Sequence, residues 1–147
     1  MAAVRFQDQL GEALRHHPGV FTYHPPDGMA SQYKPADWLC CRIGRFIAVE
    51  AKQCRTPRFY MSGWTPQQRN HCRQIMEAAG LYWLVINWRG AVGERSGNSL
   101  CCAVRGVQAL RVEEPGLDFA AAAALPGSRV ISWQPGLGWD VEPLFVP

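Results

Sequence analysis

The chain has 147 residues, of which 48% are hydrophobic and 18% charged, a composition that excludes a disordered chain and suits one domain over residues 1–147. No stretch reaches the roughly 18 consecutive apolar residues of a membrane span, and the N-terminus lacks the apolar stretch of a signal peptide. The formal net charge of +3 permits a polyanionic partner without arguing for one.

The first half of the chain predicts one helix and three strands. Apolar residues at helical spacing predict a helix over residues 3–16, which ends at a Pro-Gly pair. Residues 19–23 suit a short strand, and residues 24–35, with three prolines and a glycine, suit a loop. Two strands are expected at 36–42 and 45–52, around a tight turn.

The second strand of this pair carries polar side chains on one face only. Glu50 and Lys52 are two residues apart, so they project from the same face. The alternate residues Ile47, Val49 and Ala51 are apolar. We therefore expect that face to pack against a helix.

The clearest helix start follows a basic and aromatic segment, residues 53–64, which is expected to be a loop. Thr65 is a favourable N-cap, Pro66 suits the first helical position, and Gln68 completes a T-x-x-Q capping box. Gly80 is the expected C-cap.

The second half begins with residues 81–88, whose nearly continuous apolar sequence predicts a buried central strand. This order of elements predicts an α/β or α+β domain with a mixed central sheet flanked by helices. The remaining expectations are a turn or mobile loop at 89–98, a strand at 99–106 paired with 81–88, short helices at 107–112 and 117–124, an edge strand at 128–134, and an irregular tail from 135 docked by its aromatic residues.

The six cysteines include two adjacent pairs and no C-x-x-C. Neighbours on a strand point to opposite faces, so adjacent cysteines are poor joint metal ligands. We interpret all six as reduced in a cytoplasmic protein. A structural zinc site formed by cysteines and His71 is the alternative.

An acidic pair and a lysine carry the expected chemistry. Asp37 stands at the head of one strand, and Glu50 and Lys52 stand near the end of the next. Cleavage of a phosphodiester gathers negative charge on phosphoryl oxygens, which divalent cations held by carboxylates neutralise. Mg²⁺ prefers such oxygen ligands, and Mn²⁺ is expected to substitute. Asp37 and Glu50 are therefore predicted metal ligands, and Lys52 is predicted to orient the attacking water or to steady the phosphoryl oxygen.

Three further groups could join this site. The backbone carbonyl of Ala51 is a suitable hard ligand. Gln68 lies on the inward face of its helix, where its amide could reach the water, although its capping role alone explains its presence. Glu12 could supply another carboxylate, although it could equally be a solvated helix residue.

The sequence PADWLCCRIGRFIAVEAK, residues 35–52, followed by a helix with QQRNH, resembles the PD-(D/E)XK nuclease superfamily. It is more closely similar to the RecU-type Holliday junction resolvases and their phage relatives, which show P-x-D, a strand ending in E-A-K, and a helix with H-Q-x-x-H. The resemblance covers about residues 33–89. It implies a restriction-endonuclease-like core in which Asp37 and Glu50 bind the metal and Lys52 is catalytic.

The resemblance also implies roles for residues on the helix. Gln68 would be the catalytic helix glutamine, and His71 would match the histidine after it. Gln67 departs from the family, which has His there. The family's N-terminal acid has no clear motif here, and Glu12 is the expected equivalent. The resemblance further implies a homodimer, because a four-way junction presents two symmetric scissile phosphates.

Basic and aromatic residues surround the motif in sequence. We expect them to clamp phosphates and stack on splayed bases, rather than to form only a solvated loop. The predicted DNA-binding residues are Lys34, Arg42, Arg45, Arg55, Arg58, Tyr60 and His71, with Phe59 and Trp64 as further stacking residues.

The favoured function is a Mg²⁺-dependent, structure-selective DNA endonuclease, a Holliday junction resolvase acting as a dimer on branched DNA. One alternative is a related repair or restriction nuclease that cuts ends, flaps or duplex. Another is a non-catalytic DNA-binding module with the same fold. The expected location is the bacterial cytoplasm or a phage-infected host, and the short chain favours a phage origin.

Overall fold

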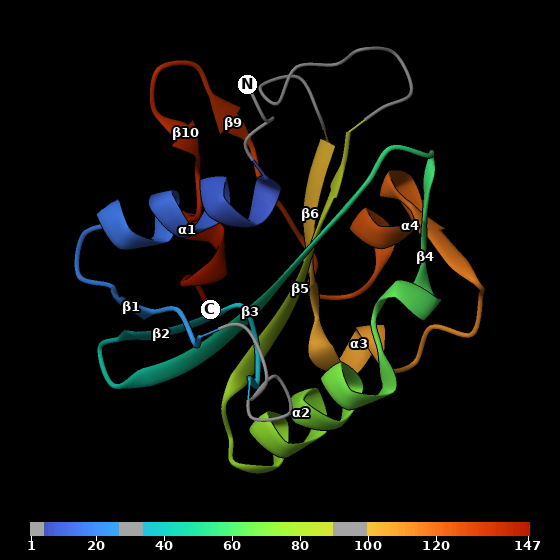
Figure 1. Cartoon of the computed structure of the whole chain (residues 1–147), viewed down its shortest axis with the longest axis horizontal. Helices are drawn as coiled ribbons and strands as arrows, with labels where there is room; N and C mark the ends of the chain where they lie inside the picture. The colour runs from blue at the N-terminus through green and yellow to red at the C-terminus, as the bar shows by residue number, and fades with distance from the viewer. Residues whose placement is uncertain (1–4, 27–33, 90–99) are drawn as a thin grey trace.

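The computed structural model describes residues 5–26, 34–89 and 100–147. Within these ranges a six-stranded sheet in the order β1-β2-β3-β5-β6-β8 forms the centre of the molecule (Figure 1). Its strands are β1 (Phe21–Tyr23), β2 (Trp38–Arg42), β3 (Arg45–Cys54), β5 (Leu81–Trp88), β6 (Leu100–Arg105) and β8 (Arg129–Val130).

The sheet is mixed because one connection is a crossover. β3 and β5 pair in parallel, whereas all other neighbours in this sheet are antiparallel. Parallel neighbours need a long connection, and helix α2 (Pro66–Glu77) provides it. The β2–β3 hairpin and this crossover therefore place the start of β2, the second half of β3 and the start of α2 close together.

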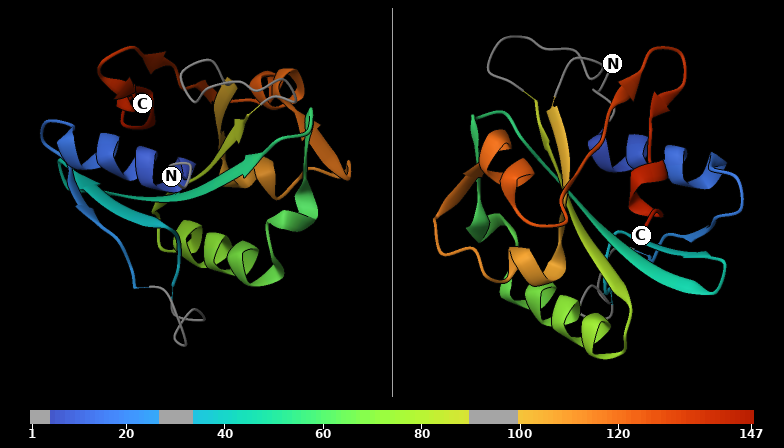
Figure 2. Two further views of the ribbon diagram at one scale, coloured as in Figure 1. Left: turned by 45° about the horizontal axis from the view of Figure 1, so that its top comes forward. Right: turned by 180° about the vertical axis from the view of Figure 1, so that it is seen from behind.

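Helices cover both faces of the sheet. α1 (Phe6–His16) lies on one face and α2 on the other, as the left view of Figure 2 shows. The other elements are α3 (Gly106–Ala109), α4 (Phe119–Ala124), the pair β4 (Arg58–Tyr60) and β7 (Gly116–Asp118), the pair β9 (Trp133–Gln134) and β10 (Gly138–Trp139), and 3₁₀ helices at Met61–Gly63 and Glu142–Leu144.

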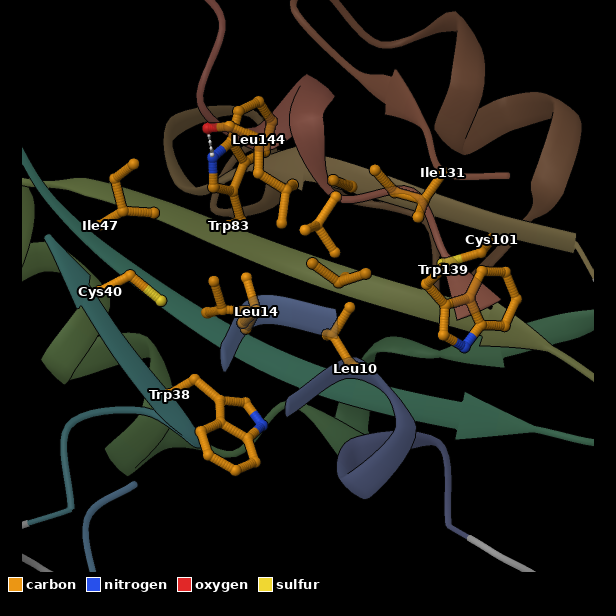
Figure 3. Close-up of a cluster of buried hydrophobic side chains, with 14 of the residues drawn as sticks. Leu10, Leu14, Trp38, Cys40, Ile47, Trp83, Cys101, Ile131, Trp139 and Leu144 are labelled. Carbon is orange, nitrogen blue, oxygen red and sulfur yellow. Dashed lines mark hydrogen bonds between the residues drawn. The ribbon is translucent and has the colours of Figure 1, made fainter. Parts of the chain in front are cut away.

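The core beneath α1 contains residues from both the N-terminal helix and the C-terminal segment of the chain. Leu10 and Leu14 of α1 pack with Ile47 of β3 and Trp83 of β5 (Figure 3). The indole N–H of Trp83 donates a hydrogen bond to the backbone carbonyl of Leu144 at 3.1 Å. This bond and the surrounding apolar contacts hold the C-terminal segment against the sheet.

The core beneath α2 fixes that helix against β5. Cys72 of α2 is fully buried with Trp64 and Tyr82. The indole N–H of Trp64 donates to the Tyr82 hydroxyl at 3.1 Å. Burying both aromatic residues with their polar atoms bonded avoids a desolvation penalty.

Most predicted elements are confirmed, including the α+β class, the hairpin, both long helices and the buried strand 81–88. Residues 53–64 were expected to be a loop, but they contain β4 and a 3₁₀ helix. The predicted edge strand 128–134 divides between β8 and β9, and the tail contains β10. These short strands pair with partners that local sequence does not reveal. Residues 90–98 of the expected loop lie outside the described ranges.

Two findings bear on the cysteines and on membranes. All six cysteines are free thiols, as expected. Among the described residues, no helix has the length and apolar character needed to span a bilayer.

Candidate active site

The β2–β3 hairpin brings Asp37 and Glu50 together. The backbone N–H of Asp37 donates to Glu50 Oε2 at 3.0 Å. The backbone N–H of Ala51 donates to Asp37 Oδ2 at 2.8 Å. Each carboxylate thus has one oxygen fixed by the backbone of the opposite strand.

The other oxygen of each carboxylate faces a lysine ammonium. Lys34 Nζ lies 3.4 Å from Asp37 Oδ1, and Lys52 Nζ lies 3.7 Å from Glu50 Oε1. The carboxylate side chains are only 10% and 5% exposed. Buried carboxylates need compensation, and these two are compensated by backbone N–H groups and by positive charge.

The electrostatic state of Glu50 reflects this crowding. Burial and, after it, the negative charge of Asp37 together raise the pKa of Glu50 to about 8, against the opposing effect of Lys52. A cation bound between the two carboxylates would favour the ionised form of Glu50. Binding of the cation would therefore be coupled to release of the Glu50 proton.

The two carboxylates open into a cavity of about 250 Å³ between the sheet and the first turns of α2. The capping box predicted from sequence is present: Gln68 N–H donates to Thr65 Oγ1 at 3.2 Å, and Gln68 Oε1 accepts from Thr65 N–H at 3.0 Å. The residues lining the cavity are Lys34, Asp37, Glu50, Thr65, Gln67, Gln68 and His71.

Two residues of α2 add polar character to this cavity. Gln67, which replaces the histidine of the similar family, lines the cavity. His71 also lines it, and its Nδ1 is buried with no hydrogen-bond partner among the described residues. An unsatisfied buried nitrogen is costly unless a ligand or water meets it.

The donor set fits a hard divalent cation. Asp37 Oδ1 and Glu50 Oε1 are not bonded to backbone N–H groups, so they are available as ligands. Mg²⁺ usually keeps several waters and binds through one or two carboxylates, which matches this pair. In the described ranges, no group of three or more His, Cys, Asp or Glu side chains is arranged to hold a metal, so waters and backbone oxygens would complete the coordination. The backbone carbonyl of Ala51 stays a predicted ligand.

Glu12 is placed elsewhere. It lies on α1, which packs on the apolar face of β3, whereas Glu50 projects from the face covered by α2. Its side chain is 61% exposed and pairs with Arg15 at 3.1 Å and His16 at 3.2 Å. The structure does not bring Glu12 into the cavity, because strand alternation separates the two faces.

Of the predicted DNA contacts, Lys34 and His71 line the cavity, and the other five divide into three groups. Arg42 is committed to an ion pair with Glu142 at 3.1 Å. Arg45 lies at the far end of the hairpin from the cavity. Arg55, Arg58 and Tyr60 are exposed.

The stacking residues need a correction. Phe59 and Trp64 are only 5% and 0% exposed, so the expectation that they stack on bases is wrong. Both belong to the core beneath α2, because the segment that carries them forms β4 and a 3₁₀ helix instead of a loop. Tyr60, on the opposite face of β4, is 58% exposed.

The ion pair between Lys34 and Asp37 is seen only in the structure. The K-P-A-D spacing is compatible with it, because two residues three positions apart before a strand can lie side by side. Thr65 was recognised as a helix cap, but its place in the cavity depends on where α2 docks.

Comparisons with known proteins agree with this geometry at the level of the fold. No protein-family model matches the sequence, and no curated protein matches it. Among solved structures, the chain is similar to Hjc, a Holliday junction resolvase from the archaeal hyperthermophile Archaeoglobus fulgidus. The TM-score is 0.51 at 10% identity, over 80% of this chain and 86% of that one. The chain therefore has the fold of a Holliday junction resolvase, as its resemblance to PD-(D/E)XK nucleases predicted.

Proposed function

We propose that this protein is a divalent-cation-dependent DNA endonuclease, and specifically a Holliday junction resolvase that acts as a homodimer on four-way DNA junctions. The observation that carries the proposal is that Asp37 and Glu50 line one cavity, with Lys52 Nζ 3.7 Å from Glu50 Oε1, on a fold similar to that of a resolvase. The fold alone supports a nuclease, and the donor set supports its chemistry.

The residues present suggest a division of labour. Asp37 and Glu50 would hold the cation through the oxygens that face the cavity. When bound, Mg²⁺ supplies Lewis-acid chemistry that neutralises charge developing on the phosphoryl oxygens. Lys52 donates hydrogen bonds that orient the attacking water or the phosphoryl oxygen. His71 and residues of the first turn of α2 line the same cavity, which supports a role for them in contacting the phosphate backbone.

The test is cleavage of a synthetic four-way junction beside a flap and a linear duplex, each of the same sequence, with Mg²⁺ and Mn²⁺. We expect paired nicks in two opposing junction strands, dependence on the added cation, and little cleavage of the other substrates. Preferred cleavage of flaps, ends or duplex would replace the resolvase by a related repair or restriction nuclease. Binding without cleavage under any cation would indicate a non-catalytic DNA-binding module.

A further inference from the structure

An apolar surface covers the hairpin end of the sheet face that carries Glu50. The register aligns Phe21 with Cys41 and Cys41 with Phe46, across β1, β2 and β3. Residues opposite one another on neighbouring strands share a face. Phe21 is 72% exposed and Phe46 is 43% exposed, so this row is open to solvent.

A groove continues the surface beyond Phe46. It has a volume of about 700 Å³ and lies between the start of β3, the end of α2 and the start of β5. Ile75, Ala78 and Leu81 provide its apolar walls together with Phe46. An exposed apolar row that leads into an apolar groove is typical of a protein-binding surface.

The hairpin tip presents a protruding side chain beside the groove. Ile43 is 89% exposed, and it has a φ of 52°, followed by Gly44 at 73°. Such two-residue turns with two positive φ angles favour Asn-Gly, and a β-branched residue there is strained. A residue that is both strained and exposed suggests a role at the tip that folding does not explain.

We propose that this surface, formed by Phe21, Cys41, Ile43, Phe46 and the groove, binds a second copy of the chain around a two-fold axis. The choice of a second copy rests in part on the proposed function, which needs two symmetric incisions. An isologous interface must be self-complementary, and this surface places a protruding apolar residue directly beside an apolar groove.

Charges at the rim also fit self-association. Arg45 lies in the wall of the groove, and Glu77 lies on the last turn of α2. Neither forms an ion pair with a residue in the described part of the chain. A two-fold axis across the groove would pair each Arg45 with Glu77 of the other copy, which gives the surface opposite charges for the same partner.

The surface leaves the catalytic cavity open. Cys41 and Asp37 are four residues apart on one strand, about 13 Å at the usual rise. The cavity lies beside the N-terminal turns of α2, whereas the groove lies beside its C-terminal end. A dimer formed here would therefore hold two open cavities, one on each side of the interface.

The first experiment measures the dissociation constant of the full chain by sedimentation equilibrium. Ile43→Asn removes the protruding side chain but supplies the residue that this turn favours. We expect at least about a tenfold weaker dimer and an unfolding midpoint, measured on dilute monomer, that is unchanged or higher. Leu137→Asn is the matched control, because Leu137 is 81% exposed on a different turn and should leave the dimer intact.

The second experiment tests whether the partner is the same chain. Arg45→Glu and Glu77→Arg should each weaken self-association, because like charges would face each other across the axis. An equimolar mixture of the two variants should recover a mixed dimer, since both rim pairs are then opposite in charge. Recovery on mixing is specific to a self-complementary interface and does not follow from misfolding of either variant.

A monomeric wild-type chain, or an Ile43→Asn variant that dimerises as well as wild type, would overturn the proposal. If the chain is monomeric and Ile43→Asn weakens its binding to a fluorescent DNA junction, the surface contacts DNA instead of a second copy. The two proposals fail in different ways. A dimer that cleaves no DNA would refute the nuclease but not the interface. A monomer that nicks junctions would refute the interface and the homodimeric action proposed above, but not the nuclease.

Discussion

The backbone N–H of Asp37 donates to Oε2 of Glu50, and the N–H that follows Glu50 returns a hydrogen bond to Asp37. Each carboxylate is therefore oriented by the strand that carries the other one. This reciprocal arrangement fixes two oxygens and leaves the other two, which lie beside Lys34 and Lys52, without a backbone donor within the ranges that the structure describes. Preorganised ligands of this kind do not have to reorient when a cation binds.

Asp37→Asn tests the metal-binding role of this pair. The amide keeps an oxygen that can accept from Ala51 N–H, so the fold should be retained. A neutral ligand holds a hard cation poorly, so we expect junction cleavage to fall at least about 100-fold. Single-turnover cleavage and Mn²⁺ titration calorimetry measure the two effects. Asp8→Asn, an exposed acid on α1 paired with Arg5, is the matched control, and equal loss in both variants would contradict the assignment.

Lys52 is predicted to act in the chemical step. Lys52→Met removes its charge and its hydrogen bonds, and we expect cleavage at saturating cation to fall by about 10² to 10⁴-fold. Because Lys52 favours the ionised form of Glu50 only weakly compared with a bound cation, Mn²⁺ binding should persist without it. Lys52→Arg should not restore the rate, since a planar guanidinium places its donors differently. Full activity in the Arg variant would indicate a purely electrostatic role.

The raised pKa of Glu50 predicts a pH dependence of stability without metal. Between pH 4.5, the ordinary pKa of a glutamate side chain, and about pH 8, the pKa of Glu50 in the fold, the folded protein keeps a proton that the unfolded chain has released. The free energy of unfolding should therefore fall as pH rises through this window. Glu50→Gln should remove this slope and stabilise the metal-free protein near pH 8 by on the order of 5 kcal/mol.

Urea unfolding of both proteins in EDTA, at several pH values, measures this effect. The same proton competes with a cation, so the affinity for Mg²⁺ should rise with pH towards about 8. A slope that is identical in wild type and Glu50→Gln would show that another group is responsible.

Gln68 caps α2, and we expect a second, separable role for its amide in the cavity. Gln68→Glu keeps the capping box, because either residue can accept from the Thr65 N–H, so the unfolding midpoint should be retained. It replaces the amide donor in the cavity by an acceptor, and we expect cleavage to fall about tenfold. Gln68→Ala should instead lose about 1 kcal/mol of stability. Wild-type cleavage by Gln68→Glu would leave capping as the whole role of this residue.

Sequence patterns were sufficient where the signal is local. The alternation in β3 predicted that Glu50 and Lys52 share a face, and the T-P-Q-Q pattern predicted the start and cap of α2. Hydrophobic continuity predicted the buried strand 81–88. Each of these depends on neighbours within a few residues, where periodicity and capping chemistry decide the structure.

Contacts between segments that are distant in the sequence could not be predicted from local patterns. β4 pairs with β7, whose residues lie more than fifty positions away, and this pairing buries Phe59. Arg42 pairs with Glu142 near the C-terminus. Residues in similar local sequence can therefore lie in the core, form an ion pair or stay exposed, depending on which distant segment packs against them.

The order of residues is enough to identify the groups that can perform chemistry: an acid before one strand, an acid and a lysine on one face of the next, and a helix start that follows them. The placement of α1 and Glu12 on the opposite face of the sheet from Glu50 depends on how the elements pack. The reason is physical. Strand and helix periodicity fix the direction of a side chain relative to its own element, whereas packing between elements fixes which directions meet.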